Sequence, residues 1–399
     1  MPGYLIPADV VPTSITVNNF PVAAARNFGI GEPLNSAEKG NWTVTATYAG
    51  GVTETLQKDD PRLSWTPANF SATAATNISV TVSYKGINAA AITGINVQTL
   101  VQRINAVLAN SSATIYLYTD ETTTASTSIN NKNITLIGVN AERTIKRSNE
   151  GKIFNLSSGG QLTLENNVTI DGSGVILNND ALILVLGNST LLTIKDGAKI
   201  VNNYNNSNSI EYSGGVSVRN GGHLIMEGGE ISGNTCIWEP GGVYLYDGTL
   251  TMYGGKITGN TSVRSNGDDV YASQYGVINL SGNSQLGDVI FTGIFNSLDS
   301  YAYITVSNDF KGSILSLGLS GDSSSSIARI KMIWTDYDAP VIKPATGFTL
   351  TKVLLDRFTL SNFLYSNGSY REPISPGYHL YGTRADETDT ARFGTLVAD

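Results

Sequence analysis

Two stretches of the chain are nearly identical. They read GGVSVRNGGHLIMEGGEISGNT at 214–235 and GGVYLYDGTLTMYGGKITGNT at 241–261. Their first residues are 27 positions apart (241 − 214), and neither stretch holds an obvious catalytic residue. A repeat at a fixed period is typical of an array in which each copy forms one structural unit. We therefore expect these glycine-rich phrases to serve packing.

A three-residue motif extends the repeat along much of the chain. Its outer residues are apolar and its middle residue is Thr, Ile or Asn, so in a strand the outer side chains face one way and the middle one faces the other. The motif stands at 134–136 (ITL), 162–164 (LTL), 192–194 (LTI), 224–226 (LIM), 250–252 (LTM), 278–280 (INL) and 304–306 (ITV). The steps between these positions are 26–32 residues. The spacing predicts one matching strand in every repeat.

Each repeat holds two further columns of apolar residues. One column is Val216/Val218, Val243/Leu245 and Val270/Ala272, and the other is Ile170, Ile200, Ile231 and Ile257. Three short strands per repeat, separated by Gly or Asn turns, describe one coil of a parallel β-helix. A single coil cannot bury enough apolar surface to offset the cost of ordering it, whereas stacked coils share one continuous core. We expect about seven or more coils.

Polar residues also recur at one turn position. Ser173, Asn203, Asn234 and Asn260 align there. Stacked Asn side chains can hydrogen-bond along the stack. The sequence therefore predicts a polar ladder that runs from coil to coil.

The first part of the chain has a different pattern. Residues 14–20, 41–51 and 77–86 alternate apolar and polar side chains, and Gly50 and Gly51 suit a tight hairpin turn. Several short strands within about 80 residues favour a β-sandwich. The phrases VTATYAGGVTETL (44–56) and ISVTVSYKGINAAAITGINV (78–97) resemble a bacterial Ig-like domain. That resemblance implies a spacer or stalk.

An amphipathic helix is expected between the two parts. Within residues 97–112 one helical face carries Leu100, Val101, Ile104, Val107 and Leu108. Such a helix can cover the open end of a β-helix core. We therefore predict an all-β fold, a right-handed parallel β-helix preceded by an Ig-like β-sandwich and a short capping helix. Its parts are the Ig-like sandwich (1–95), the capping helix (96–112), the β-helix (113–320), and terminal coils with a C-terminal cap (321–399).

The glycine motifs carry a family resemblance. GGV at 214–216 and 241–243, with ISGN at 231–234 and ITGN at 257–260, resembles right-handed parallel β-helix proteins of the pectin-lyase-like superfamily. More narrowly, the chain resembles the GG-A-[ILV] and F-x-x-N repeats of polymorphic outer-membrane adhesins over about residues 113–310. Val replaces the Ala of the first motif and Ile replaces the Phe of the second. The resemblance implies a bacterial surface protein.

Composition excludes several partners. The net charge is −8 with no Lys/Arg run, which disfavours nucleic acid and anionic membranes. Cys236 is the only cysteine, so neither an intrachain disulfide nor a cysteine metal site is possible. No apolar stretch approaches the roughly 20 residues of a transmembrane segment. The start, MPGYLIPADVVP, contains no export signal. We expect an extracellular or cell-surface location.

Many proteins of the pectin-lyase-like type are enzymes that act on polysaccharides, and their chemistry needs two or more carboxyl groups held close together. The outward carboxylates are Glu165, Glu227, Glu230, Asp247, Asp268 and Asp269. Coils about 4.8 Å apart place Glu165 and Glu227 roughly 10 Å apart, too far to chelate one ion. We interpret these acids, including the pair Asp268 and Asp269, as a solvated face.

Two further features suggest catalysis but have simpler interpretations. TIDGSG at 169–174 resembles a phrase of polygalacturonase-like β-helices. That family's paired aspartates, Gly-His-Gly and Arg-x-Lys motifs are missing from this sequence. We therefore expect Asp171 and Gly172 to form a turn. The only imidazoles are His223 and His379. We predict no catalytic residue, no metal and no cofactor.

Loops before the GGV motifs form the best candidate binding site. The candidate ligand-binding residues are Glu211, Tyr212, Trp238, Glu239, Tyr244, Tyr246, Arg264 and Tyr271. Aromatic faces stack on sugar rings, while carboxylates and amides bind hydroxyls. Alternatively, Trp238 folds back over its own coil as a lid.

Three functional hypotheses follow. The leading one is a non-catalytic bacterial surface or secreted protein, an adhesin or glycan-binding β-helix whose partner is a polysaccharide or a host or matrix glycoprotein. The second is a polysaccharide lyase or glycoside hydrolase of the pectin-lyase-like type. The third is a purely structural surface stalk.

Overall fold

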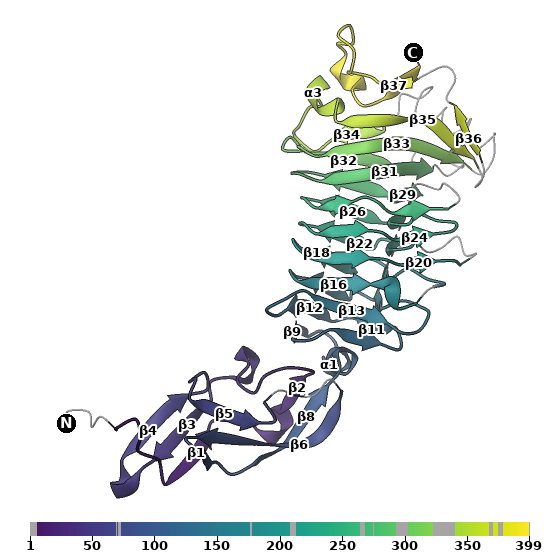
Figure 1. Ribbon diagram of the computed structural model, residues 1–399. Helices are drawn as coiled ribbons and strands as arrows, with labels where there is room; N and C mark the ends of the chain where they lie inside the picture. Colours follow the sequence, from purple (N-terminus) through teal and green to yellow (C-terminus); the bar gives the residue numbers. More distant parts are fainter. Residues whose placement is uncertain are drawn as a thin grey trace. The chain divides into compact units, whose positions relative to one another are not determined.

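The computed structural model describes most of the chain (Figure 1). The described residues are 6–68, 70, 73–175, 178–207, 213–263, 268–273, 275–292, 302–321, 340–366, 370–373 and 378–398. They divide into two compact units, Met1–Arg103 with Tyr116–Thr119, and Ile104–Ile115 with Asp120–Asp399. Both units are built mainly from strands, as predicted.

The first unit is a β-sandwich. One sheet is antiparallel and consists of β1 (Ser14–Asn18), β3 (Thr43–Thr47) and β4 (Thr53–Gln57). The other holds β2 (Asn27–Gly29), β8 (Ile92–Gln98), β6 (Ala75–Tyr84) and β5 (Leu63–Thr66), with β7 (Ile87–Asn88) beside β6. Short 3-10 helices are Ala23–Ala25, Ala37–Lys39 and Ala49–Gly51.

Aromatic residues dominate the core between these two sheets. Phe28 and Trp42 are fully buried, and the ring centroids of Phe28 and Phe70 lie 4.6 Å apart. Gly50 and Gly51 both have φ of 81° in the turn between β3 and β4, which confirms the predicted hairpin. The predicted sandwich is therefore present. One pairing departs from a purely antiparallel sandwich, because β2 and β8 are parallel.

The predicted helix is shorter than its pattern suggests. Helix α1 spans Leu100–Ala106, and Leu100 and Ile104 are fully buried. Leu108 lies beyond its end and is 75% exposed, so the predicted apolar face stops before it. Lys132 donates a hydrogen bond to the carbonyl oxygen of Ile104 at 3.1 Å. The second half of the helix is thereby tied to the first coils of the second unit.

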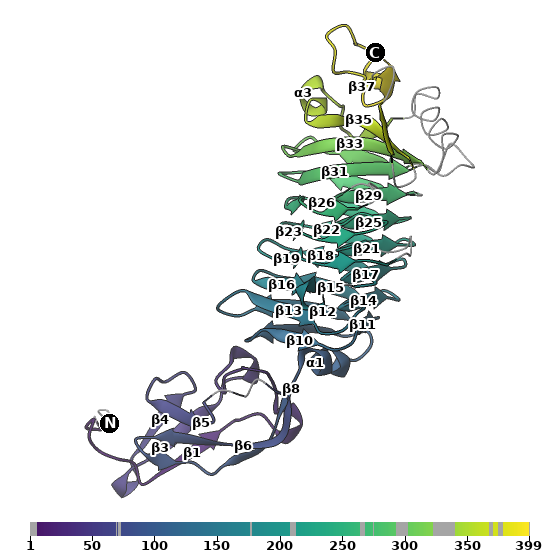
Figure 2. The ribbon, with the colours of Figure 1, turned by 45° about the vertical axis from the view of Figure 1, so that its right-hand side comes forward.

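The second unit is a parallel β-helix whose coils stack as rungs (Figures 1 and 2). Its first face, face 1, is a nine-stranded parallel sheet. The strands are β9 (Ser112–Leu117), β12 (Asn133–Gly138), β15 (Gln161–Leu164), β18 (Leu191–Ile194), β22 (His223–Met226), β26 (Thr249–Met252), β30 (Val277–Leu280), β32 (Tyr303–Val306) and β34 (Ile342–Pro344). All seven predicted motifs lie in these strands, and neighbouring motifs pair in the predicted register.

Two more faces complete each coil. Face 2 contains β10 (Glu121–Thr123), β13 (Arg143–Arg147), β16 (Val168–Asp171), β19 (Lys199–Val201), β23 (Glu230–Ser232) and β27 (Lys256–Ile257). Face 3 contains β11 (Thr127–Asn130), β14 (Phe154–Ser157), β17 (Ile183–Leu186), β21 (Val216–Arg219), β25 (Val243–Tyr246) and β29 (Val270–Ser273). Between them lie the 3-10 helix η4 (Gly172–Gly174) and the short strands β20 (Tyr204–Asn205), β24 (Thr235–Cys236) and β28 (Thr261–Ser262). We call the bends from face 1 to face 2 and from face 2 to face 3 the first and second corners.

The later coils are wider. Strand β31 (Gln285–Thr292) pairs with β27 through its first residues and with β29 through its later ones, so faces 2 and 3 merge. The regular three-faced part therefore has about six turns rather than seven. β33 (Ser313–Gly321) and β35 (Phe358–Ser366) extend the merged sheet, and β36 (Tyr370–Pro373) is antiparallel to β35. Near the end lie α3 (Lys352–Leu355), β37 (Tyr378–Leu380), the 3-10 helix Thr390–Arg392 and β38 (Leu396–Ala398).

Aliphatic columns fill the β-helix. Leu164, Ile194, Met226, Met252 and Leu280 are register partners in successive strands of face 1. None of them exceeds 2% exposure. The column Ile170, Ile200, Ile231 and Ile257 is likewise continuous on face 2. The period and the inward positions read from the sequence are thus confirmed.

Candidate functional site

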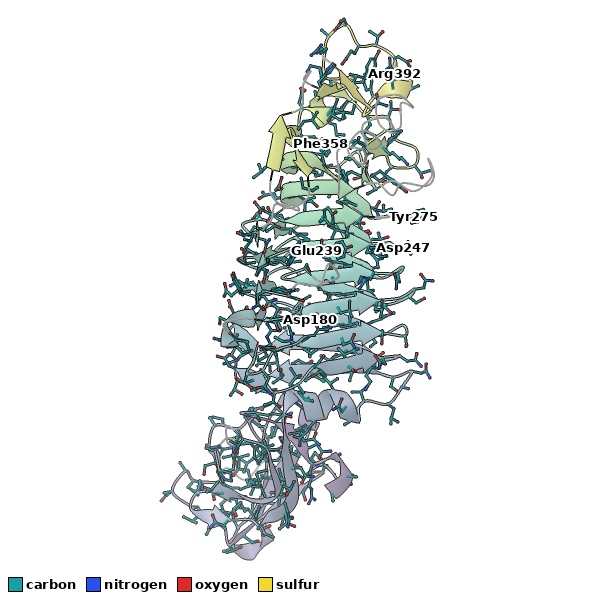
Figure 3. All side chains as sticks on the ribbon, turned by 90° about the vertical axis from the view of Figure 1, so that its right-hand side faces the viewer. Asp180, Glu239, Asp247, Tyr275, Phe358 and Arg392 are labelled. Atoms are coloured by element: carbon teal, nitrogen blue, oxygen red, sulfur yellow. The ribbon has the colours of Figure 1, made fainter. Side chains whose placement is uncertain are left out.

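Most of the predicted loop patch can be located. Glu211, Tyr212 and Arg264 lie outside the described residues. Trp238 is partly buried, and Glu239 is almost fully buried in the same loop. Figure 3 shows Glu239 well away from Tyr275 and Asp247, which project at one edge of the β-helix.

Tyr244 and Tyr271 are less accessible than expected. Both side chains point away from the interior of the coils, between inward neighbours of face 3. Their rings stack with centroids 5.7 Å apart and an interplanar angle of 20°. They are nevertheless only 5% and 9% exposed and pack with Ile290. Burial, followed by the charge of Glu239, raises the pKa of Tyr244. These two rings pack on each other, and they form no open stacking surface.

Tyr246 keeps part of its ring accessible. It is half-buried, and the guanidinium of Arg219 lies 5.2 Å from its ring centroid. Arg219 is the register partner of Tyr246 in the preceding coil. The contact between Arg219 and Tyr246 could have been predicted from the sequence, because the two residues occupy the same position in neighbouring repeats. Among the described residues of the patch, Trp238 and Tyr246 are therefore the accessible ones, and Arg219 lies beside Tyr246.

The predicted Asn ladder exists and is buried. The backbone N–H of Asn203 donates to Oδ1 of Asn234 at 3.1 Å, and that of Asn234 donates to Oδ1 of Asn260 at 3.1 Å. Ser173 is exposed and does not belong to the ladder. Its place next to Asn203 is taken by Arg147 and Asn178, which both donate to Oδ1 of Asn203.

Asp269 ends this ladder, which corrects its assignment to a solvated face. It is 4% exposed, and its Oδ1 accepts hydrogen bonds from the backbone and the side chain of Asn260, both at 2.9 Å. Its Oδ2 accepts from the backbone N–H of Asp288. Burial raises the pKa of Asp269. Because both oxygens serve the packing of a turn, Asp269 is a structural residue.

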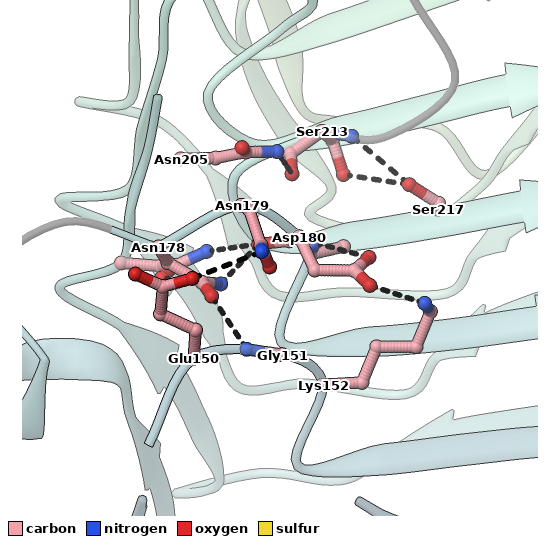
Figure 4. Close-up of polar contacts among 11 residues, drawn as sticks. Glu150, Gly151, Lys152, Asn178, Asn179, Asp180, Asn205, Ser213 and Ser217 are labelled. Carbon is pink, nitrogen blue, oxygen red and sulfur yellow. Dashed lines mark hydrogen bonds and ion pairs between the residues drawn. The ribbon is translucent and has the colours of Figure 1, made fainter. Parts of the chain in front are cut away.

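Figure 4 shows a second polar network, which is joined to the ladder by the hydrogen bond from Asn178 to Oδ1 of Asn203. Asp180 forms an ion pair with Lys152 and accepts from the backbone N–H of Ala181 at 2.9 Å. Burial, opposed by Lys152, raises the pKa of Asp180. Sequence reasoning missed this carboxyl, because Lys152 and Asp180 lie 28 residues apart, about the length of one coil, and meet only when the coils stack.

Several outward carboxylates pair with lysines that lie one or two coils away. The Nζ–carboxylate distances are 2.8 Å for Lys195–Glu165, 2.6 Å for Lys199–Glu142, 3.0 Å for Lys256–Glu230 and 3.3 Å for Lys146–Asp171. Hydrogen bonds from Lys199 and Thr169 lower the pKa of Glu142. At Glu230, burial alone would raise the pKa, but the hydrogen bonds from Ser232 and Lys256 outweigh it and hold the pKa below its ordinary value. Glu142 and Glu230 are therefore ionised at neutral pH.

Asp171 has the structural role that its sequence suggested. Its Oδ1 accepts the backbone N–H of Ser173 at 2.9 Å, so it caps the 3-10 helix η4. The hydrogen bonds of Ser173, Asn202 and Lys146 outweigh burial and lower its pKa. The predicted turn at Asp171 and Gly172 is confirmed.

The histidines and the cysteine also have local partners. Nε2 of His223 lies 2.9 Å from Oγ1 of Thr251, and burial lowers the pKa of this imidazole. Nε2 of His379 lies 2.6 Å from Oε1 of Glu387. Cys236 is buried, which raises the pKa of its thiol to about 11. The thiol is therefore protonated at neutral pH.

An open groove, which the sequence did not indicate, lies at the first corner. Its volume is about 350 Å³. The lining residues are Asp196, Gly197, Ala198, Lys199, Gly229, Glu230, Gly255, Lys256, Asn283 and Gln285. Lys199, Glu230, Lys256 and Gln285 are register partners in four successive coils, so they form one wall along the β-helix axis. We call this feature the corner groove.

The groove offers both donors and acceptors. Lys199 and Lys256 are 39% and 46% exposed although each binds a carboxylate. Asp196, Asn283 and Gln285 are exposed. Neighbouring coils are spaced by about 4.8 Å, so ammonium, carboxylate and amide groups alternate at that interval. Gly197, Gly229 and Gly255 also line the groove and contribute no side chain to it.

Comparisons with protein-family models, with curated proteins and with solved structures found no match for this chain. Among the described residues, no group of three or more His, Cys, Asp or Glu side chains could hold a metal ion. Neither helix in the described part of the chain has the length and apolar character needed to cross a bilayer.

Proposed function

We propose that this chain is a non-catalytic carbohydrate-binding β-helix, an adhesin of a bacterial cell surface or a secreted product, and that it binds a polysaccharide or a glycoprotein glycan. The observation that carries the proposal is the corner groove. Its wall repeats once per coil, and a glycan also repeats along its length. A regular wall therefore suits an extended ligand that runs along the β-helix axis.

The chemistry of the groove favours a hydroxyl-rich ligand. Hydroxyl groups both donate and accept, and the wall alternates donors (Lys199, Lys256) with an acceptor (Glu230). Lys199, Lys256 and Glu230 are already paired, so this wall has little charge left to attract a highly charged polymer. A neutral or weakly acidic glycan is the class that fits.

The state of the carboxylates supports binding rather than hydrolysis. A general acid works best with a pKa raised toward the working pH. In the groove, the pKa of Glu230 is lowered and its carboxylate is bound by Lys256. Outside the groove, burial raises the pKa of Asp180, Asp269 and Glu38. Each of these carboxyls accepts hydrogen bonds, Asp180 from Lys152 and the backbone of Ala181, Asp269 from Asn260, and Glu38 from Tyr118. Each of these groups has a structural partner that catalysis would have to remove.

A polysaccharide panel tests the proposal. Binding would be measured by calorimetry or on a glycan array, and the same mixtures would be assayed for new reducing or unsaturated ends. We expect binding without cleavage, with at least a tenfold loss of affinity in Lys256→Ala. Lys195→Ala is the matched control, because Lys195 makes the same kind of ion pair outside the groove.

The outcomes separate the three hypotheses. Equal binding by the two lysine variants would refute the groove as the site. New chain ends would establish the lyase or hydrolase alternative. A panel without any binder would leave the chain as a structural stalk.

The loop patch is a second candidate site for the same function. Trp238 and Tyr246 are half-buried, and Arg219 lies over the Tyr246 ring. Tyr246→Ala should weaken glycan binding if this patch contributes. Tyr253→Ala is its control, since Tyr253 is 57% exposed on another part of the surface. Equal affinities would remove the patch from the proposal.

The sequence resemblances are consistent with this function. The GGV and ISGN/ITGN motifs resemble polymorphic outer-membrane adhesins and the pectin-lyase-like superfamily, and the N-terminal sandwich resembles a bacterial Ig-like spacer. A cell-surface adhesin built from a spacer and a binding β-helix would combine these features.

A further inference from the structure

Arg147 is a buried cation inside the β-helix. It lies at the end of strand β13 on an inward position and is 2% exposed. Its Nη2 donates to Oδ1 of Asn203, two coils away. The glycine at position 172 lies between these coils and has no side chain to block the contact. The guanidinium is therefore anchored at one end of the polar ladder.

Two nitrogens of the guanidinium have no hydrogen-bond partner among the residues that the structure describes. Nε and Nη1 are buried and make no hydrogen bond. Together these two atoms carry three N–H donors. A buried donor that is left unpaired destabilises the folded state, and an unpaired donor of a charged group destabilises it more. The arrangement therefore calls for an acceptor that the described residues do not supply.

Two buried threonine hydroxyl groups near Arg147 also have no hydrogen-bond partner among the described residues. Thr123 is the register partner of Arg147 on the neighbouring strand β10, and Thr127 opens strand β11 just after it. Both are buried, and Oγ1 of each has no hydrogen-bond partner. A hydroxyl can donate as well as accept. Arg147 and the two threonines thus present unpaired donors in one part of the interior.

The nearby carboxylates are already engaged. Asp180 and Glu150 are the acids whose charges act on Arg147. Asp180 accepts from Lys152 and from the backbone of Ala181, and Glu150 accepts from Asn179 at 3.0 Å. In the part of the chain that the structure describes, no carboxylate lies within ion-pair distance of Arg147. Burial accordingly lowers the pKa of Arg147 to about 10.

We propose that Arg147, with Thr123 and Thr127, binds a small monovalent anion of halide type inside the first coils of the β-helix. The anion accepts from Nε and Nη1 of Arg147 and from the threonine hydroxyls. It also supplies the negative charge that a buried guanidinium needs. Chloride is the natural candidate. The site is independent of the proposed glycan binding.

The first test compares salts. Melting temperatures of the full chain would be measured in sodium chloride and in sodium gluconate at equal ionic strength. A ligand that binds only the folded state raises stability with its concentration. We expect a higher melting temperature in chloride for the wild type and no such difference for Arg147→Met, which keeps an unbranched apolar stem. An equal response of both proteins to the two salts would overturn the proposal.

A second measurement covers the case in which Arg147→Met does not fold. Crystals of the wild type would be grown or soaked in bromide, and the anomalous signal would be mapped. We expect a peak beside Nε and Nη1 of Arg147, and a several-fold weaker chloride response in Thr123→Val. Density for ordered water alone at this position, without an anomalous peak, would refute the anion site.

Discussion

The first and second corners of the β-helix have the same backbone requirement and opposite surroundings. Both use left-handed residues: Gly229 and Gly255 have φ of 72° and 79° at the first corner, and Gly233 and Gly259 have φ of 65° and 71° at the second. At the second corner the next residue is Asn, and its side chain turns inward into the ladder. At the first corner the next residue is Glu230 or Lys256, and its side chain faces the groove.

This difference separates stability from recognition. The ladder satisfies buried polar groups, so a change there leaves donors and acceptors without partners. The corner groove is open, so its side chains can vary at little cost to folding. A repeated backbone thus provides one corner that holds the coils together and another that is available for a ligand.

The largest expected effect is at the second corner. The side chain of Asn234 donates to the carbonyl oxygen of Ile200 and to Oδ1 of Asn260, and it accepts from the backbone of Asn203. Asn234→Ala should therefore lower the free energy of unfolding by about 3 kcal/mol or more. Denaturation with urea measures this loss.

A surface asparagine provides the control. Asn279 is an outward residue of face 1 and donates to Oγ1 of Thr251 at 3.1 Å. Asn279→Ala should cost less than about 1 kcal/mol. Similar losses for the two variants would show that the ladder has no special role.

Two glycines test the comparison more finely. An added Cβ at Gly259 meets nothing within 4 Å. Gly259→Ala should therefore lower the free energy of unfolding only by the strain of holding alanine in the left-handed conformation, about 1–2 kcal/mol. At Gly255 the same Cβ would lie 2.4 Å from the carbonyl oxygen of Gly228, so Gly255→Ala should cost clearly more. Thermal unfolding of both variants decides this. If they are equally stable, packing does not demand a glycine at the first corner.

The smallest expected effect concerns pH. The folded state lowers the pKa of Glu142 below its ordinary value of 4.5, chiefly through the hydrogen bond from Lys199. A carboxyl whose pKa is lower in the folded than in the unfolded state stabilises the fold at pH values above its unfolded-state pKa. This contribution is lost as the pH falls through the folded-state pKa. Glu142→Gln should remove the contribution, which is well under about 1 kcal/mol for so exposed a pair. Urea titrations at neutral and acidic pH should show a slightly flatter pH dependence in the variant. An unchanged pH dependence would contradict this assignment.

The fold was largely predictable from the sequence. The motifs at 134–136 through 304–306 gave the strands of face 1 and their register, because a strand alternates its side chains and stacked coils repeat that alternation. Asn203, Asn234 and Asn260 were likewise aligned by counting. The parallel pairing of β2 with β8 could not be predicted from the sequence, because these two strands do not belong to a repeat that would show their register.

The candidate site was much less predictable. Tyr244 and Tyr271 were expected to offer aromatic faces to a ligand, but packing on the outer side of face 3 buries them. Asp269 was expected in solvent, and the turn before β29 places it in the ladder. The corner groove depends on residues from four coils, so no single stretch of sequence shows it.

The sequence by itself determined which side of each strand faces the core, because a period-two pattern repeated every 26–32 residues admits only one stacking register. The tertiary structure decided which outward and turn residues meet water. Exposure depends on side chains from other coils, as the stacked Tyr244 and Tyr271 show. It also decided the charge environment of Arg147 and Glu230, because Asp180 and Lys256, which act on them, lie in other coils and reach them only when the coils stack.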